Sequence, residues 1–416
     1  MLQQFFVAAF PEPMREAMWL FLKFAPIWLP IFLLYAFFSL WIRWIRAEFI
    51  NNQETCLLEI NLPSVVDKSP LAMEAVLGGL HNRAGEATYY KKFWIGSTRP
   101  WFSLEIVSTE GQVHMYVWTR RAWKRQVEFH FYAQYPDIEI VEVPDYTRQI
   151  RFDLDEIDLW GIDMKKTLTD LQPIKSYVDY GMDKNPKEEE RIDPIAHVLE
   201  FMASMGPGEH LWLQILIRVN KAERFKPGTF IQQTFQKRIS DRVAEIYANP
   251  EKVNVSMDDG GGRQIKTLSA DQEFEIDLLW RTGGKQAFDT GIRMIYLARR
   301  ENFDGTNIPG IIGAFRSFNS ESGTFNAIGP DPARYLIKFD YPWQDYRDIR
   351  QNRERYKVFD AYRRRSWFYA PYRTPYFNMN VEELATIFHL PGGDVKTPTL
   401  QRIPSTRETA PSNLPV

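Results

Sequence analysis

The most constraining feature of the chain is a run of nineteen residues without a charged side chain, from Phe24 to Ile42. In a helix that rises about 1.5 Å per residue, this run is about 28 Å long, close to the ~30 Å hydrocarbon thickness of a bilayer. Pro26 and Pro30 each remove a backbone donor and are expected to bend the helix. The sequence therefore predicts one transmembrane helix near the N-terminus.

The residues beside this run argue against a cleaved signal peptide and against a buried core helix. No small-residue cleavage pattern follows it, and Arg43 and Arg46 stand where a stop signal is expected. The basic residues before the run nearly equal in number those just after it, so the positive-inside rule does not decide the orientation. The residues expected at the membrane interface are Trp19, Trp41, Arg43, Trp44 and Arg46.

Composition restricts the part of the chain that follows. Residues 47–416 are long enough for two or three domains. The chain carries 51 basic and 53 acidic residues, and this balance speaks against a stand-alone nucleic-acid-binding protein. Cys56 is the only cysteine, which excludes an intrachain disulfide and allows a reducing compartment. We expect the soluble region to lie in the cytoplasm, at the inner membrane.

Hydrophobic periodicity predicts an α+β fold in residues 51–150. Apolar residues alternate in four predicted strands, and a turn at Glu110-Gly111 joins the middle two into a hairpin. One helix is expected to begin at Ser69-Pro70, and a second to cover residues 120–135. The order β-α-β-β-α-β is that of a ferredoxin-like unit, with two helices on a four-stranded antiparallel sheet.

A second, divergent ferredoxin-like unit is predicted over residues 151–335. Its helices are expected to begin at Asp193-Pro194 and to cover residues 308–318, and its strands to cover residues 211–219, 292–297 and 325–328. Two further helices, at residues 230–248 and 270–281, would be insertions. The predicted fold is thus one transmembrane helix followed by tandem ferredoxin-like units.

The sequence contains no recognisable catalytic or cofactor motif. A phosphate-binding loop needs Gly, four residues and then Gly-Lys-Ser/Thr, so that backbone donors surround the phosphates and the hydroxyl meets magnesium. Ile265 stands where residues 262–267 need the second Gly, and Gln286 stands where residues 283–286 need the hydroxyl. The six histidines lack metal-ligand spacing, and no Gly-x-Ser-x-Gly elbow occurs. We expect a non-catalytic protein without cofactor or metal.

The most unusual polar segment is residues 344–373, where nine basic residues outnumber four acidic ones and eight aromatic residues are interleaved. Such a mixture can grip phosphates and stack bases, or bind anionic lipid head groups. It can equally form a charged helix whose aromatic residues, such as Tyr356 and Phe359, lie in the core. The candidate residues for contact with DNA or a partner are Arg347, Arg350, Arg353, Arg355, Lys357, Arg363, Arg364, Arg365 and Arg373.

Three stretches resemble a known family: residues 69–74 with 99–105, residues 133–136, and residues 380–392, in which Glu-Glu-Leu-Ala-Thr is the most specific element. They resemble an uncharacterised bacterial family of membrane-anchored proteins, common in candidate-phyla bacteria with reduced genomes. Its members are fused to, or paired with, HerA/FtsK-like ATPases similar to type IV secretion and conjugation motors. The resemblance covers nearly the whole soluble region, and its motifs are not catalytic ones.

Residues 1–416 contain no phosphate-binding loop, unlike the fused members of that family. The resemblance therefore implies an accessory or N-terminal module whose motor ATPase is another chain. The expected organisation is an N-terminal segment with the transmembrane helix (1–50), a first unit (51–150), a second unit (151–335), a basic and aromatic helical region (336–390) and a Pro-rich tail (391–416) that docks on the ATPase.

These observations predict a single-pass membrane protein that serves as a non-catalytic module of an oligomeric type IV secretion-like or DNA-translocating assembly. The expected partners are the lipid bilayer, a motor ATPase and DNA. The alternatives are a membrane-bound enzyme whose site is not recognisable from sequence, and a nucleic-acid-binding protein that uses residues 344–373. A deep pocket with convergent titratable groups would favour the enzyme.

Overall fold

The computed structural model describes residues 12–63, 68–86, 88–184, 193–221, 224–226, 229, 231–250, 252–256, 262–319, 325–335, 343–392 and 402–403. The chain divides into two compact units, one of residues 1–52 with 85–98 and one of residues 53–84 with 99–416. It therefore leaves the first unit after residue 52, returns to it at residue 85 and leaves it again after residue 98.

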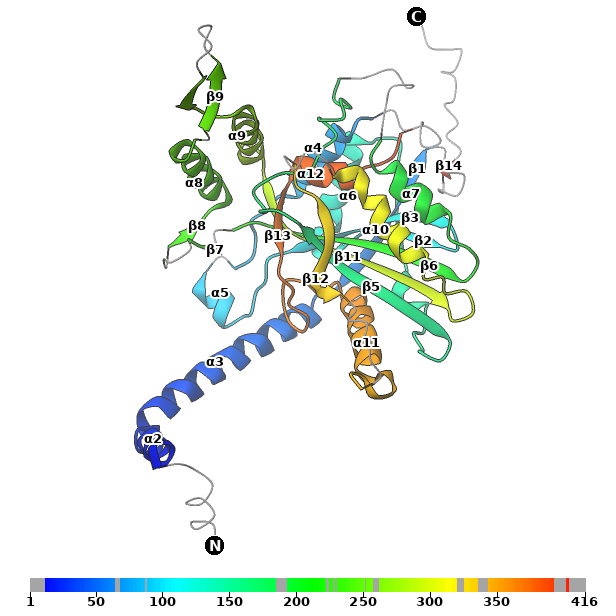
Figure 1. Cartoon of the computed structure of the whole chain (residues 1–416). Coiled ribbons are helices and arrows are strands. Elements are labelled where there is room, and N and C mark those ends of the chain that lie inside the picture. The colour runs from blue at the N-terminus through cyan, green and yellow to red at the C-terminus, as the bar shows by residue number, and fades with distance from the viewer. Residues whose placement is uncertain are drawn as a thin grey trace, which may run out of the picture. The chain divides into compact units, whose positions relative to one another are not determined.

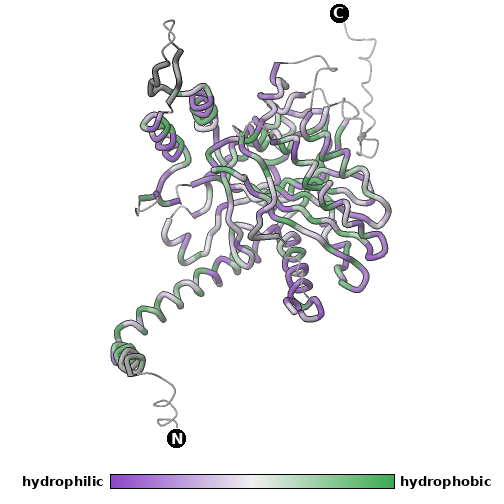
Figure 2. The backbone as a smooth tube through the Cα atoms, viewed as in Figure 1, coloured by the Kyte–Doolittle hydropathy of each residue, from purple (hydrophilic) through white to green (hydrophobic). Residues whose placement is uncertain are grey.

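The first unit contains the long apolar helix predicted from the sequence. α2 (Glu12–Lys23) and α3 (Ala25–Asn51) are separated at Phe24, and hydrophobic residues predominate along α3 in Figure 2. The most apolar stretch of α3 is not buried by any part of the chain that the structure describes. By length and composition α3 can cross a membrane, and a signal sequence near the N-terminus would meet the same criteria.

The two prolines of α3 differ in their effect on the helix. Pro26 lies in the first turn, where a missing N–H leaves no helical hydrogen bond unmade, whereas Pro30 lies inside the helix. α3 also continues beyond Ile42, so Arg43 and Arg46 are helical. The described part of this unit also contains the short helix α5 (Tyr89–Phe93).

The second unit begins with six elements in the predicted β-α-β-β-α-β order (Figure 1): β1 (Thr55–Pro63), α4 (Pro70–Leu80), β2 (Trp101–Thr109), β3 (Gln112–Arg120), α6 (Lys124–Gln134) and β4 (Glu139–Val143). The Ser69 hydroxyl caps α4 by accepting from the Leu71 N–H, as the Ser-Pro signal predicts. The strands lie in the spatial order β4-β1-β3-β2, and every pairing among them is antiparallel.

The following elements extend the same sheet. They are β5 (Ile157–Lys166), α7 (Ala196–Ala203), β6 (Glu209–Val219), β11 (Ala287–Arg299), α10 (Asn307–Ala314) and β12 (Ile328–Tyr335). Their strands lie in the order β6-β11-β5-β12, and β6 pairs antiparallel with β2. The predicted strand at 325–328 begins instead at Ile328, and β5 is a strand that the sequence analysis did not include.

The segment between β6 and β11 contains the two predicted inserted helices, α8 (Phe235–Ala248) and α9 (Ala270–Gly283). Thr234 and Ser269 cap them, and the helices share a small core of their own around Ile239 and Leu279. Short strands accompany them: β7 (Arg224–Phe225), β8 (Gln232–Gln233), β9 (Lys252–Ser256) and β10 (Gly262–Lys266).

The C-terminal elements return to the sheet. They are α11 (Ile349–Arg363), β13 (Phe377–Asn380), α12 (Val381–Ile387) and β14 (Arg402–Ile403), with the 3-10 turns η1 (Arg121–Trp123), η2 (Tyr146–Arg148), η4 (Phe315–Phe318) and η5 (Tyr346–Asp348) elsewhere in the chain. β13 pairs antiparallel with β11, and β14 pairs parallel with the end of β1. The Pro-rich tail lies outside the described residues, apart from 391–392 and β14.

The two faces of the sheet differ in chemistry. On one face, alternate residues such as Phe102 and Ile292 form an apolar core with α4, α6, α7, α10 and α12. The other face carries buried polar residues, including Glu105 on β2. The chain after α11 packs against it so closely that a Cβ on Gly291 would lie 2.1 Å from the Trp367 ring. This polar face receives Arg365, one of the candidate residues.

Candidate functional site

The structure separates the nine candidate contact residues of segment 344–373 into three groups. Arg355 and Lys357 are half-buried, and Arg355 pairs with Asp158 of β5 at 2.9 Å. Arg365 is only 1% exposed, which removes it from any surface for DNA or a partner. The exposed members are Arg347, Arg350, Arg353, Arg363, Arg364 and Arg373.

The aromatic residues of this segment are mostly core residues, as the structural interpretation of the segment predicts. Five of them are buried, whereas Tyr356 remains 47% exposed and packs its edge against Phe152 at 5.1 Å between ring centroids. They are therefore not a row of exposed stacking platforms. The buried five are Phe359, Tyr362, Trp367, Phe368 and Tyr369.

Arg365 is the centre of a buried network on the polar face of the sheet. Its Nε lies 3.0 Å from Glu105 Oε1, and its Nη1 contacts Asp145. Tyr146 donates to Glu105 at 2.8 Å, and the Tyr146 and Tyr362 hydroxyls lie 2.7 Å apart. Burial lowers the pKa of Arg365, but the charges of Glu105 and Asp145 raise it more, so the guanidinium stays charged.

Two arginines on the strands continue this polar face. Arg218 on β6 pairs with Asp289 at 2.7 Å, and its guanidinium lies 4.6 Å from the Phe368 ring centroid. Arg293 on β11 pairs with Asp163 at 2.8 Å and lies 4.9 Å from the Trp367 centroid. The segment after α11 thus places its aromatic rings over strand cations that are already paired with carboxylates.

We expect Arg365→Ala to lower the free energy of unfolding by about 3 to 5 kcal/mol, because Glu105 would be left buried without its cation. Arg364→Ala is the matched control, since the Arg364 side chain is 56% exposed and pairs with Asp360 one helical turn earlier. That change is expected to cost less than about 0.5 kcal/mol. Urea unfolding of the detergent-solubilised protein measures both, and equal costs for the two variants would contradict the buried network.

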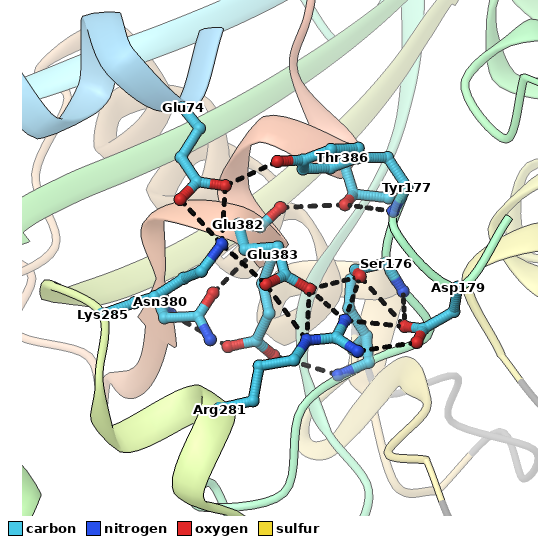
Figure 3. Close-up of polar contacts among 11 residues, drawn as sticks. Glu74, Ser176, Tyr177, Asp179, Arg281, Lys285, Asn380, Glu382, Glu383 and Thr386 are labelled. Carbon is cyan, nitrogen blue, oxygen red and sulfur yellow. Dashed lines mark hydrogen bonds and ion pairs between the residues drawn. The ribbon is translucent and has the colours of Figure 1, made fainter. Parts of the chain in front are cut away.

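A second buried network lies around α12, whose sequence contains the Glu-Glu-Leu-Ala-Thr motif (Figure 3). Glu383 pairs with Lys166 of β5 at 2.6 Å, and the two side chains are 0% and 1% exposed. Glu383 also accepts from the backbone N–H of Asn380 at 2.9 Å and of Ile174 at 3.0 Å. Because an unpaired buried carboxylate is costly, these contacts fix the start of α12 against β5 and residue 174.

Glu382 collects contacts from separate parts of the chain, as the dashed lines in Figure 3 show. Arg281 Nε of α9 lies 3.0 Å from Glu382 Oε1, and Lys285 Nζ lies 2.8 Å from Glu382 Oε2. Arg281 also reaches Asp179 at 2.8 Å, and Lys285 reaches Glu74 of α4 at 2.7 Å. Residues on α4, α9, α12 and the chain near Asp179 are thereby held in one ion network.

The charges of this network are mutually stabilised. Burial raises the pKa of Glu382, but hydrogen bonds from Arg281, Lys285 and Ser176 lower it more, so the net pKa is below its ordinary value. Burial lowers the pKa of Arg281, and its bonds to Asp179 and Glu382 more than reverse this effect. Each of these groups is occupied by a partner within the chain, so the arrangement suits a structural clamp on α12.

His389, two residues after α12, forms a further buried pair with Asp193. Its Nε2 lies 3.1 Å from Asp193 Oδ1, and its Nδ1 lies 2.9 Å from the Ala385 carbonyl oxygen. Burial lowers the pKa of His389, but Asp193 raises it more, so the net pKa is above the ordinary value. Within the described ranges, no group of three or more His, Cys, Asp or Glu residues is arranged to hold a metal ion.

Two cavities in the second unit bear on the enzyme alternative. A cavity of about 890 Å³ lies beside the ends of β2, β6 and β11, and His210 is the one histidine among its lining residues. Burial lowers the pKa of His210. The charged residues around this cavity have both signs: Glu110, Arg151, Asp155, Glu156, Arg299, Arg300 and Glu301. A smaller one, of about 140 Å³, contains His81 and Lys285. Neither cavity shows a paired nucleophile and base, so neither is assigned a reaction.

The functional residues that sequence reasoning missed are the basic partners of α12. The resemblance singled out residues 380–392, but Lys166, Arg281 and Lys285 were not predicted to bind them. Arg281 and Lys285 are spaced by four residues, and this spacing on a helix end could have indicated a cationic pair. Nothing in the sequence pattern identifies the carboxylates that they reach.

The chain belongs to the family of the Domain of unknown function DUF8128, whose model matches residues 53–402. No curated protein matches the sequence. The family match begins shortly after α3, and it covers the second unit up to residue 402, the α5 segment and the α12 network.

Because the folded state raises the pKa of His389, the stability that the proton contributes is fully present below the unfolded pKa of about 6.5. It is lost as the pH rises through the folded pKa. Replacing His389 by Gln should therefore cost most near pH 6, about 1 to 3 kcal/mol, and progressively less toward pH 9.

Urea unfolding of the wild type and the variant across this pH range measures the effect. His197→Gln, at an exposed position on α7, is the matched control and should cost less than about 0.5 kcal/mol. A cost of His389→Gln that grew with pH would show that the histidine is buried neutral.

Proposed function

We propose that this protein is a single-pass, membrane-anchored, non-catalytic module of a type IV secretion-like or DNA-translocating assembly. In this proposal α3 holds the protein at the cytoplasmic membrane, the second unit faces the cytoplasm, and a separate HerA/FtsK-like motor ATPase docks on it. The observation that carries the proposal is the exposed apolar surface of α3, because side chains such as Leu33 (55% exposed) and Phe37 (58%) lack protein cover. Lipid is the solvent that such a surface requires.

The proposed architecture of the second unit is a pair of ferredoxin-like units. In the first half the strands β1, β2, β3 and β4 lie in the order 4-1-3-2, counted along the chain. The strands β5, β6, β11 and β12 of the second half lie in the same order, and the two halves meet through β2 and β6. This repeated order supports a duplication in which α8 and α9 are inserted between the second and third strands of the second copy.

A continuous sheet of this kind suits a scaffold. Charged side chains on its polar face are paired within the chain, and α12 is clamped by the Glu382 network. A closely packed domain that does not deform internally can transmit force between a membrane anchor and a motor. The exposed arginines of segment 344–373 are the best candidates for contact with DNA or the partner, with Arg365 excluded by its burial.

The anchor is tested by introducing charge into α3. The full-length chain is expected to stay in the membrane pellet after alkaline extraction, and the double variant Leu33→Arg/Leu34→Arg to be released. Each arginine at the centre of a span costs about 2.5 to 3.5 kcal/mol. Leu71→Arg, at an exposed leucine of α4, is the matched control and should remain in the pellet.

The mass of the purified chain distinguishes an anchor from a signal sequence. An intact N-terminus in the membrane fraction supports the anchor. A mature chain that begins after α3, or a wild type that stays in solution without detergent, would overturn it.

The docking of a motor is tested by chemical cross-linking in intact membranes, followed by mass spectrometry of the captured proteins. We expect a HerA/FtsK-like ATPase among the partners cross-linked to the wild type. The variant Arg347→Ala/Arg353→Ala/Arg363→Ala removes exposed cations and is expected to weaken capture if this surface is used, with Lys237→Ala on α8 as the control. Capture of no ATPase, together with substrate turnover by the purified chain alone, would favour the enzyme alternative.

A further inference from the structure

Residues 85–98, within the loop between α4 and β2, belong to the first unit with α3, although they are far from α3 in sequence. The Trp41 indole N–H donates to the Phe93 carbonyl oxygen at 3.0 Å, and the Trp41 and Trp94 ring centroids are 6.3 Å apart. Arg46 lies 3.6 Å from Glu86. These contacts place Glu86, Phe93 and Trp94 beside the C-terminal part of α3.

Gly96 shows how closely the loop approaches the helix. Its φ is +70°, and a Cβ at this position would lie 2.5 Å from the Ile45 carbonyl oxygen. Only glycine is free of strain in this backbone conformation and leaves room for the helix backbone. Ile45 is accordingly 5% exposed, while the apolar positions before Trp41 are uncovered by the described chain. The loop therefore covers α3 around Ile45 and leaves the apolar stretch before Trp41 without cover from the described chain.

At that level the loop exposes large aromatic side chains. Tyr89 is 84% exposed, Tyr90 64% and Trp94 61%, and Trp44 of α3 beside them is 59% exposed. Thr88 caps α5 by accepting from the Lys91 N–H at 3.2 Å, which fixes the short helix that carries the two tyrosines. So many exposed aromatic residues in one short stretch are unusual for a surface in contact with water.

The level along α3 at which these aromatic side chains lie indicates the environment that surrounds them. The charge-free stretch ends at Ile42, and the contacts of the loop reach α3 from Trp41 to Arg46. Five residues of helix rise about 7 Å, which is close to the thickness of one interfacial layer of a bilayer. Tyrosine and tryptophan are the side chains enriched in that layer, and Lys91 and Lys92 lie among them.

We propose that residues 88–95, together with Trp41 and Trp44, form an interfacial collar that lies in the headgroup layer of an anionic bilayer. The aromatic rings lie at the boundary with the acyl chains, and the two lysines face anionic lipid phosphates. The occupant is lipid because the collar is continuous with the apolar surface of α3 and carries the charge that anionic lipids attract. This inference rests on the proposed membrane span of α3.

The collar is tested on the full-length protein in vesicles by fluorescence labels at single introduced cysteines. Cys56 is 5% exposed and burial raises the pKa of its thiol, so the natural cysteine reacts poorly with thiol reagents. The label is placed at Tyr90→Cys in the collar, at Leu33→Cys in α3, and at Trp280→Cys on α9 as the control for an exposed aromatic residue. Quenchers attached to lipids at the headgroup level or deep in the acyl chains report the depth of each label.

The collar predicts that the label at residue 90 is quenched by the headgroup-level quencher, the label at 33 by the deep quencher, and the label at 280 by neither. Quenching at 33 without quenching at 90 overturns the collar and leaves the span intact. Absence of quenching at both positions overturns both proposals. Equal headgroup-level quenching at 90 and 280 also overturns the collar, because it shows non-specific contact with lipid.

The role of the two lysines is tested in vesicles of phosphatidylcholine with and without phosphatidylglycerol. Each lysine near an anionic surface favours contact roughly fivefold. Lys91→Gln/Lys92→Gln should therefore reduce quenching at residue 90 in anionic vesicles and leave neutral vesicles unaffected, whereas Lys237→Gln should change neither. An equal effect of the double variant in both kinds of vesicle would overturn the assignment of these lysines to anionic lipid.

Discussion

The structure depends on the pairing of buried charges on one face of the sheet. Glu105 on β2, Asp289 on β11 and Asp163 on β5 are buried on this face, and each would be costly if left alone. Their cations come from both the strands and distant sequence: Arg218 and Arg293 from β6 and β11, and Arg365 from the chain after α11. The first half of the second unit therefore requires the C-terminal segment. The family match from residue 53 to residue 402 covers both the strand carboxylates and this distant cation.

The same requirement explains which elements could be predicted from sequence. The strands β1, β2, β3 and β6 alternate apolar and polar residues, and α4 begins at the recognisable cap Ser69, so local pattern was sufficient for these elements. β5 was missed although Trp160, Ile162 and Met164 alternate, because its intervening residues include Asp163, whose burial depends on Arg293 across the sheet. Local pattern carries no information about a partner that is 130 residues away.

The candidate residues illustrate the same limit at the scale of single side chains. Arg364 and Arg365 are adjacent and chemically identical, yet one is on the surface and the other is among the most buried residues of the chain. Arg365 has a φ of +49°, a left-handed backbone position that turns its side chain inward at the end of α11. A run of basic residues in the sequence therefore contains more cations than the folded surface offers for binding. Conversely, the Glu-Glu pair of α12 is recognisable in the sequence, whereas its role as a clamp requires Lys166, Arg281 and Lys285 from other elements.

The connection between the two units follows from how the chain is divided. A terminal helix that forms a unit of its own normally has one covalent link to the rest of its chain. Here the chain passes between the units three times, after residues 52, 84 and 98. At the last passage Arg99 is buried in the second unit, where its guanidinium donates to the Val219 carbonyl oxygen at 2.7 Å and its backbone N–H donates to the Tyr369 hydroxyl at 3.1 Å. The third passage is therefore fixed at Arg99 in the core of the second unit. The loop that contains α5 accounts for two of the three passages, those after residues 84 and 98.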